Sequence, residues 1–173
     1  MDELACLTQV GLILIAVAWI GKHLLFAHLG TEKIVPRVEE MSPFFVVERT
    51  RNKLVVSAKI PFVNEGKQCG VIMDALIHLR SPYAQHNISI WGKVELDGQP
   101  REDDYFEAML IQKGERIHLA VKFCIEPCNG VSLDEALEHL PDFPFDLIYQ
   151  ESGRISAHYS KVTLTLPHKA LGG

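Results

Sequence analysis

The stretch KLVVSAKIPFVNEGKQCGVIMDALIHL, Lys53–Leu79, decides the fold class of this chain. In its first half every second residue is apolar, which is the pattern of a β-strand that buries one face. The predicted buried set is Leu54, Val56, Ala58, Ile60 and Phe62. The turn signal NEG separates this strand from a second apolar run. We therefore predict two strands joined by a turn, and Pro61 predicts an edge strand or a strand end.

The same alternation recurs at short intervals through the rest of the chain. Further strands are predicted at Cys69–Leu79, Ile88–Leu96, Tyr105–Gln112, Arg116–Ile125, Asp146–Gln150 and Arg154–Leu166. Glycine-containing turns such as LDGQP and KGE stand between them. In the last strand the apolar parity switches, which predicts a β-bulge near Ser160. Several short strands with mostly local connections are typical of an antiparallel β-sandwich.

One short helix is predicted among the strands, in SLDEALEHLPDFP. Ser132 and Glu135 have the spacing of a capping box, and Pro141 ends the segment. The apolar face consists of Leu133, Leu137 and Leu140. We expect this helix to cover one open end of the sandwich.

The N-terminal segment is predicted to cross a membrane once, from Leu4 to Leu29. No charged residue occurs between Leu4 and Gly21, and as a helix this part alone reaches about 27 Å of the roughly 30 Å hydrocarbon core. The acidic start MDELA and the following KHLLFAHLG argue against a cleaved signal peptide. A buried helix of a soluble domain is disfavoured because every side of the segment is apolar. The lipid bilayer is thus an expected partner.

The C-terminal domain is expected on the cytoplasmic side. Asp2 and Glu3 precede the apolar segment, whereas Lys22, Lys33 and Arg37 follow it, and an excess of Lys and Arg marks the cytoplasmic flank. Three of the four cysteines lie outside this segment, and Cys69 has the parity of a buried residue. An odd number of cysteines and a buried thiol fit a reducing compartment.

The stretch VVSAKIPFVNEGKQCGVIMDALIHL resembles the opening hairpin of immunoglobulin-like domains of the late-embryogenesis-abundant and fibronectin-like types, in which an Asn-x-Gly turn joins two strands. The resemblance covers Pro43–Pro167 as architecture and FVNEG as a motif. The paired cysteines and buried tryptophan of antibody domains are missing in the expected form, because Trp91 has outward parity. The resemblance implies a binding or spacer module without chemistry of its own.

The predicted fold class is therefore mainly β: an N-terminal transmembrane α-helix, then an antiparallel immunoglobulin-like β-sandwich with one short helix. The expected divisions are a helix at residues 1–29, a connector at 30–42, the sandwich at 43–167 and a flexible tail at 168–173. The connector GTEKIVPRVEEMS is charged and contains a proline.

The stretch KFCIEPCNG places Cys124 and Cys128 four residues apart. Parity puts Cys124 on the outward face of its strand, with His118, and Cys128 in a turn after Pro127. Three readings stay open: unpaired thiols, a disulfide closing a very short loop, or a metal or redox site. The spacing is not the C-x-x-C of a thioredoxin-like motif.

Other chemistry has weaker signals. The acidic stretch REDDYFEA, Arg101–Ala108, has the carboxylates of a metal or acid–base site, but such a run is more typical of a solvated loop. The histidines have no metal-ligand spacing, and neither a phosphate-binding glycine loop nor a nucleophile elbow occurs. A net charge of −5 without a basic stripe disfavours nucleic acid as a partner. We expect no cofactor, no metal and no enzymatic activity.

The function that these patterns favour is a non-enzymatic binding or assembly module at a membrane surface. We expect an unknown protein partner to contact an exposed strand edge or the outward aromatic residues Trp91 and Tyr105. The alternative is an extracytoplasmic accessory domain of the cell envelope with a Cys124–Cys128 disulfide. An enzyme that uses the REDD carboxylates or a metal is the least favoured hypothesis.

Overall fold

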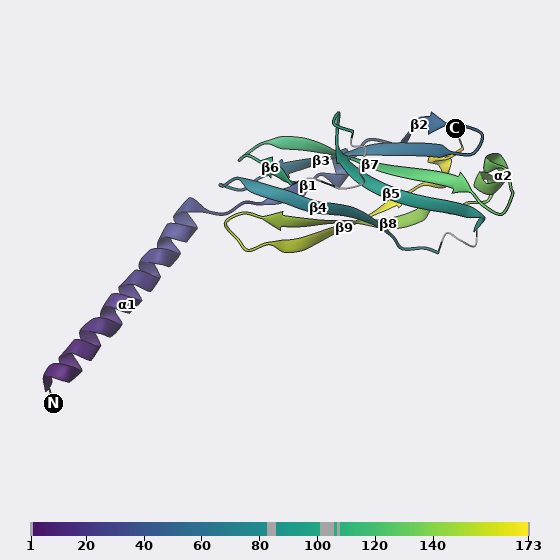
Figure 1. Cartoon of the computed structure of the whole chain (residues 1–173). Helices are drawn as coiled ribbons and strands as arrows, with labels where there is room; N and C mark the ends of the chain where they lie inside the picture. The colour runs from purple at the N-terminus through teal and green to yellow at the C-terminus, as the bar shows by residue number, and fades with distance from the viewer. Residues whose placement is uncertain (1, 83–85, 101–105, 107, 173) are drawn as a thin grey trace.

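The computed structural model of the chain describes residues 2–82, 86–100, 106 and 108–172 (Figure 1). A long apolar helix, α1 (Asp2–Leu29), stands apart from two antiparallel sheets that lie face to face. A short helix, α2 (Leu133–Glu138), lies at the end of the sandwich opposite α1. The predicted fold class is confirmed: a mainly β chain with an N-terminal apolar helix and one short helix.

The two sheets divide the strands without regard to their order in the chain. The five-stranded sheet has the order β1–β3–β7–β5, and β2 also pairs with β3. Its strands are β1 (Ile34–Pro36), β2 (Phe45–Arg49), β3 (Leu54–Asn64), β5 (Ile88–Leu96) and β7 (Arg116–Pro127). The four-stranded sheet has the order β6–β4–β8–β9. Its strands are β4 (Gly70–Leu79), β6 (Met109–Ile111), β8 (Phe143–Ser152) and β9 (His158–Leu166).

The predicted opening hairpin is wrong, because β3 and β4 lie in different sheets. One edge of β3 bonds to β7 and the other bonds to β1 and β2, so that no edge remains for β4. The NEG turn therefore carries the chain from one sheet to the other. Gly66 in this turn serves a close approach: a Cβ there would lie 2.5 Å from the backbone of Thr31 and Lys33. Only glycine fits that contact.

Pro61 lies inside a central strand, so the edge-strand prediction is also wrong. Lys59 shares its parity and directs its N–H toward Ser42, whose Oγ accepts it at 2.9 Å. The N–H that Pro61 lacks would point to the same side, between Pro36 and Phe45, where neither β1 nor β2 pairs with β3. Proline is tolerated because no ladder bond is lost there.

The core forms where the inner faces of the sheets meet. The predicted alternation in β3 is confirmed, since Leu54, Val56, Ala58, Ile60 and Phe62 are all fully buried. At the centre, the rings of Phe123 and Phe145 contact edge-to-face at 4.8 Å, and Phe44 lies within 6.4 Å of both. Each buried phenylalanine contributes about 1.5–3 kcal/mol. These contacts hold the two sheets together.

Several strand boundaries differ from the sequence prediction. β1 and β2 were not predicted, because IVP is too short and FFVVER does not alternate. β8 and β9 keep one continuous register from Phe143↔Leu166 to Glu151↔His158, so the bulge near Ser160 is wrong. The parity switches because residues 153–157 form the turn between the two strands.

The short helix follows its prediction closely. Ser132 is the N-cap, and its Oγ accepts the N–H of Glu135 at 3.2 Å. Leu133, Leu137 and Leu140 are buried as predicted. The helix thus closes one end of the core, as expected for a cap packed through an apolar face.

The domain boundaries stay a prediction, and both flanking ranges contact the sandwich. In the range 30–42, β1 pairs with β3 and is followed by a 3₁₀ turn at Val38–Glu40. In the range 168–173, a 3₁₀ turn at His168–Ala170 leads to Leu171, which is fully buried.

Candidate functional site

The outer face of the five-stranded sheet carries the candidate binding surface. Trp91 on β5 stands opposite Cys124 on β7, and Cys124 stands opposite Val55 on β3. The next row along the strands consists of Lys93, Lys122 and Ser57. Trp91 lies on the outward side that its parity predicted and is 43% exposed. The outer face of a sheet, away from the core, is an unusual place for the large apolar area of an indole.

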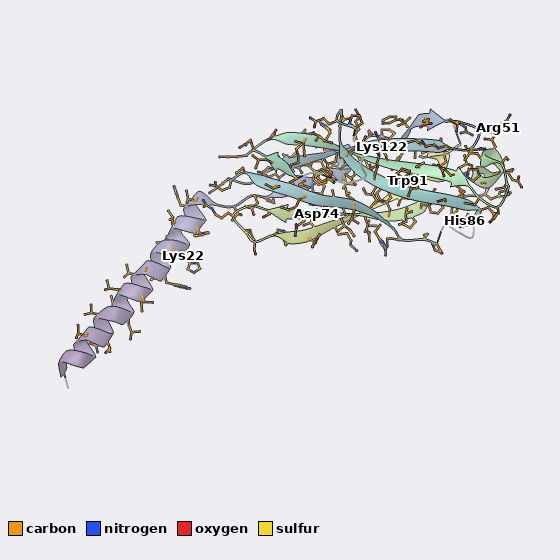
Figure 2. The ribbon with its side chains drawn as sticks, viewed as in Figure 1. Lys22, Arg51, Asp74, His86, Trp91 and Lys122 are labelled. Carbon is orange, nitrogen blue, oxygen red and sulfur yellow. The ribbon has the colours of Figure 1, made fainter. Side chains whose placement is uncertain are left out.

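A hollow of about 220 Å³ lies beside this indole, which we call the Trp91 pocket. It is lined by Val47, Glu48, Lys53, Val55, Trp91, Lys93, Lys122 and Cys124. Val47 is contributed by β2, where the pairing with β3 shifts register, and it is 50% exposed. Figure 2 places Trp91 and Lys122 on the sandwich well away from α1, with Arg51 and His86 at the far end.

Three lysines and one glutamate line the Trp91 pocket. Lys53 pairs with Glu48 at 3.1 Å, and its hydrogen bond to this carboxylate raises the pKa of Lys53. Lys93 and Lys122 both pair with Glu95. The Glu126 carboxylate also lies close enough to act on Lys53.

Glu95 is itself unusual, since it is 5% exposed on an outward position. One of its carboxylate oxygens pairs with Lys122, while Oε2 is buried without a hydrogen-bond partner and lies 3.7 Å from the Lys93 ammonium. A buried carboxylate oxygen without a donor is costly. Glu95 thus has one unused hydrogen-bond acceptor, Oε2, next to two lysines that line the pocket.

Cys124 differs from its expectation. It is on the outward side of β7, as parity predicted, but only 3% exposed, because it lies between Trp91 and Val55 in neighbouring strands. Burial raises the pKa of this thiol, and the Glu126 carboxylate raises it further. A thiol with a raised pKa is a poor nucleophile, so Cys124 contributes apolar surface to the pocket.

The positions of Cys128 and Cys69 also bear on the sequence predictions. Cys128 follows the end of β7, is half-buried, and donates its N–H to the Asn87 carbonyl at 2.7 Å. Cys124 and Cys128 are both free thiols in this structure. Cys69 is exposed and not buried as predicted, because β4 begins only at Gly70.

Two expected features lie outside the described residues. Tyr105, a predicted contact residue, is one of them, and so are the REDD carboxylates of Arg101–Asp104. Within the ranges that the structure describes, no group of three or more His, Cys, Asp or Glu side chains is arranged to hold a metal ion.

A second polar site, which sequence reasoning missed, joins α1 to the sandwich. Glu32 is 6% exposed, and its carboxylate accepts the N–H of Arg154 at 2.8 Å and of Ile155 at 3.0 Å. Burial raises the pKa of Glu32, but these backbone donors outweigh it and hold the pKa below its ordinary value. Gly153 is required here, since a Cβ would lie 2.4 Å from Glu32.

Asn64 completes this junction. It is fully buried, and its Oδ1 accepts the N–H of Gly66 at 3.0 Å and of Lys33 at 3.2 Å. Its Nδ2 donates to the carbonyls of Gln68 and Ile111. One amide thereby ties four segments together: the chain leaving α1, the β3–β4 turn, β3 and β6. The only sequence signal was its place in FVNEG.

The C-terminal end of α1 is capped by the sandwich. Gly30 takes a φ of +68° and donates to the Phe26 carbonyl, which is the usual glycine stop of a helix. Gln68 Nε2 donates to the Leu29 carbonyl at 2.8 Å, and Arg154 lies 5.4 Å over the Phe26 ring. The helix thus meets the sandwich through specific bonds.

Comparison with known proteins gives only distant likenesses. No protein-family model and no curated protein matches the sequence. The crystal structure of the GAE domain of GGA2p from Saccharomyces cerevisiae is 14% identical, with a TM-score of 0.36 over 79% of this chain and 98% of that one. The yeast GGA1 GAE domain is 11% identical, with a TM-score of 0.30 over 72% of this chain and 99% of that one.

Proposed function

We propose that this chain is a non-enzymatic binding module, anchored in a membrane by α1, that holds a segment of a partner protein in the Trp91 pocket. The observation that carries the proposal is an exposed indole beside a hollow that three lysines line. Tryptophan dominates the energetics of protein interfaces when a partner excludes water from it. Trp91 lies on the outer face of the sheet, so the packing of the core does not account for its exposed position.

The anchor is the first part of the proposal. Leu7–Leu29 is long and apolar enough to cross a membrane, and none of it is buried by the sandwich. As a helix it spans about 35 Å, which matches a hydrocarbon core of roughly 30 Å. The specific capping at Gly30 and Arg154 favours a retained helix over a cleaved signal sequence, since cleavage would discard these contacts.

The chemistry of the pocket defines the partner segment. An apolar side chain fits against Trp91 and Val47, and the lysines that line the hollow favour an acidic neighbour. The partner is therefore a protein segment that presents a large apolar residue next to Asp or Glu. Contacts of this kind add specificity mainly by excluding segments with Lys or Arg at that position.

The proposal is tested by photocrosslinking of the full chain in native membranes. A benzophenone amino acid replaces Val47 in one variant and, as the matched control, Thr165 in another, since both are exposed strand residues. We expect a discrete protein adduct from position 47, lost with Trp91→Ser and retained with Trp91→Phe. The crosslinked peptide should contain the apolar–acidic pair. Adducts of equal yield from both positions, or an adduct insensitive to Trp91→Ser, would contradict the proposal.

The side of the membrane is the remaining part. We propose that the sandwich is cytoplasmic, because Lys22 lies in the C-terminal part of α1 and Lys33 and Arg37 follow the helix. Cys69 is the best reporter, being exposed. In intact cells a membrane-impermeant maleimide should leave Cys69 unlabelled until the membrane is opened, with Cys69→Ser as control. Labelling of intact cells would favour the extracytoplasmic alternative.

A further inference from the structure

One group of exposed apolar residues is left unused by the Trp91 pocket, and it lies on the other sheet. Tyr159 is 63% exposed, Leu110 52% and Ile155 46%. Leu110 on β6 stands opposite Val71, and Val71 stands opposite Ser152, so the row leads across the sheet to the turn that holds Ile155. Tyr159 is the second residue of β9, shortly after this turn, and stands opposite Gln150. We call Leu110, Ile155 and Tyr159 the interfacial patch.

This patch is placed beside the end of α1 by the junction. Arg154 lies over the Phe26 ring and donates to the Gly30 carbonyl at 3.4 Å, while the adjacent Ile155 N–H is held by Glu32. If Leu7–Leu29 spans a bilayer, Phe26 and Gly30 mark the depth of the lipid headgroups. The turn that carries Ile155 must then lie at the same depth. In Figure 1, α1 runs from the junction toward the side of the sandwich on which β9 lies.

The charges at this end match a lipid surface. Lys22, Lys67 and Arg154 form no ion pair with a carboxylate anywhere in the described part of the chain. Lys22 and Arg154 both approach the Phe26 ring, at 5.9 and 5.4 Å, so both cations lie near this end of α1. The Glu32 carboxylate lies close by, but its hydrogen bonds are to backbone N–H groups and not to these three side chains. Unpaired cations beside exposed aliphatic and aromatic residues are the composition of membrane interfaces.

We propose that the interfacial patch rests on the headgroups of anionic phospholipids, so that the four-stranded sheet is tilted onto the membrane and the Trp91 pocket on the opposite sheet faces away from it. This inference rests on the proposed membrane anchor. Tyr159 and Ile155 enter the headgroup region, and Lys67 and Arg154 contact lipid phosphates. The two faces of the sandwich then have separate tasks: one binds lipid and the other binds protein.

The test uses the full chain reconstituted in vesicles of phosphatidylcholine with or without phosphatidylserine. A bimane is attached at Tyr159→Cys or, as the matched control, at Thr165→Cys, which is exposed on the same face of β9. Six residues, about 20 Å of strand, separate the two positions. The other cysteines are replaced by alanine, apart from the buried Cys124. Nitroxide lipids labelled at the headgroup serve as quenchers.

We expect strong quenching at position 159 and weak quenching at position 165, with a larger difference when phosphatidylserine is present. Arg154→Gln should reduce the contact equilibrium about fivefold in these vesicles and less in pure phosphatidylcholine, because one cation near an anionic leaflet has an effect of that size. Equal quenching at the two positions, or no effect of phosphatidylserine, would overturn the inference.

Failure of the anchor can be distinguished from failure of the patch. With Trp91→Phe, Trp19 is the sole tryptophan, and acyl-chain nitroxides should quench it if α1 spans the bilayer. Quenching of Trp19 without quenching at position 159 overturns only the interfacial patch. Absence of quenching at Trp19 overturns the anchor and this inference together.

Discussion

Two buried glutamates mark the two polar regions of this protein, and their partners differ. Glu32 at the junction is 6% exposed, and each of its carboxylate oxygens accepts a backbone N–H. Glu95 beneath the Trp91 pocket is 5% exposed, is shared by two lysines, and has one oxygen without a hydrogen-bond donor. The two carboxylates are thus buried to the same extent but differ in how completely they are hydrogen-bonded.

The difference extends to the surroundings. At the junction, glycines at 66 and 153 admit backbone and carboxylate at contact distance, and Asn64 uses all of its polar atoms. At the Trp91 pocket, aromatic and aliphatic side chains stay exposed and three lysines line the hollow. We infer that the junction is built for stability and that the pocket gives up some stability for recognition.

The largest expected effect is at the junction, from Asn64→Ala. The substitution leaves two N–H groups and two carbonyls without their partner, and some of these groups are buried. The free energy of unfolding should therefore fall by about 3 kcal/mol. Chemical denaturation in detergent micelles measures it. Asn64→Asp keeps the Oδ1 acceptor but loses the donor, and should lie between alanine and the parent. A loss below about 0.5 kcal/mol for alanine would remove the distinction between the two regions.

A smaller effect is expected when acid titrates Glu32. Because its pKa is lowered in the folded chain, the stability it contributes is present above the ordinary carboxyl value of 4.5 and is lost as pH falls through the folded value. The amide resonances of Arg154 and Ile155 should report this loss below about pH 4.5. Glu32→Gln should abolish that pH dependence while keeping one carbonyl acceptor. Unchanged amide resonances across this range would show that the carboxylate does not hold the turn.

The smallest effect on stability is expected at the pocket. Trp91→Ser removes a ring that is 43% exposed and uncovers the buried Cys124, so the free energy of unfolding should fall by about 1 kcal/mol. The same variant should lose the photocrosslinked adduct. A destabilisation of about 2 kcal/mol or more would show that Trp91 is a packing residue after all.

Period-two alternation predicted the core correctly because burial in a strand depends on local parity. It placed the core residues of β3 and β7 on the inner faces and Trp91 outside, but it did not predict that the outward Cys124 is buried as well. It did not predict which sheet each strand joins, since a turn such as NEG is compatible with a hairpin or with a crossing between sheets. In the folded chain the Asn64 side chain at this turn bonds to the Ile111 carbonyl in the other sheet, and such a partner cannot be recognised in the local sequence.

The junction and the pocket were missed for the same physical reason. Glu32 stands in a charged connector, and its partners Arg154 and Ile155 are more than 120 positions away. Val47 belongs to β2, whose exposed residues do not alternate, so nothing predicted that it would line a pocket with Trp91. Long-range contacts decide both sites, whereas the capping box of α2 is local and was predicted.

We conclude that hydrogen bonds at the junction fix α1 to the sandwich, whereas the Trp91 pocket stays open. Backbone hydrogen exchange of the full chain in vesicles tests this most directly. We expect Glu32–Ile34 and residues 153–155 to exchange as slowly as the central strands β3 and β7, and Glu32→Ala to release both segments while β5 around Trp91 is unaffected. Fast exchange of these segments in the parent chain, at the rate of an unstructured linker, would contradict it.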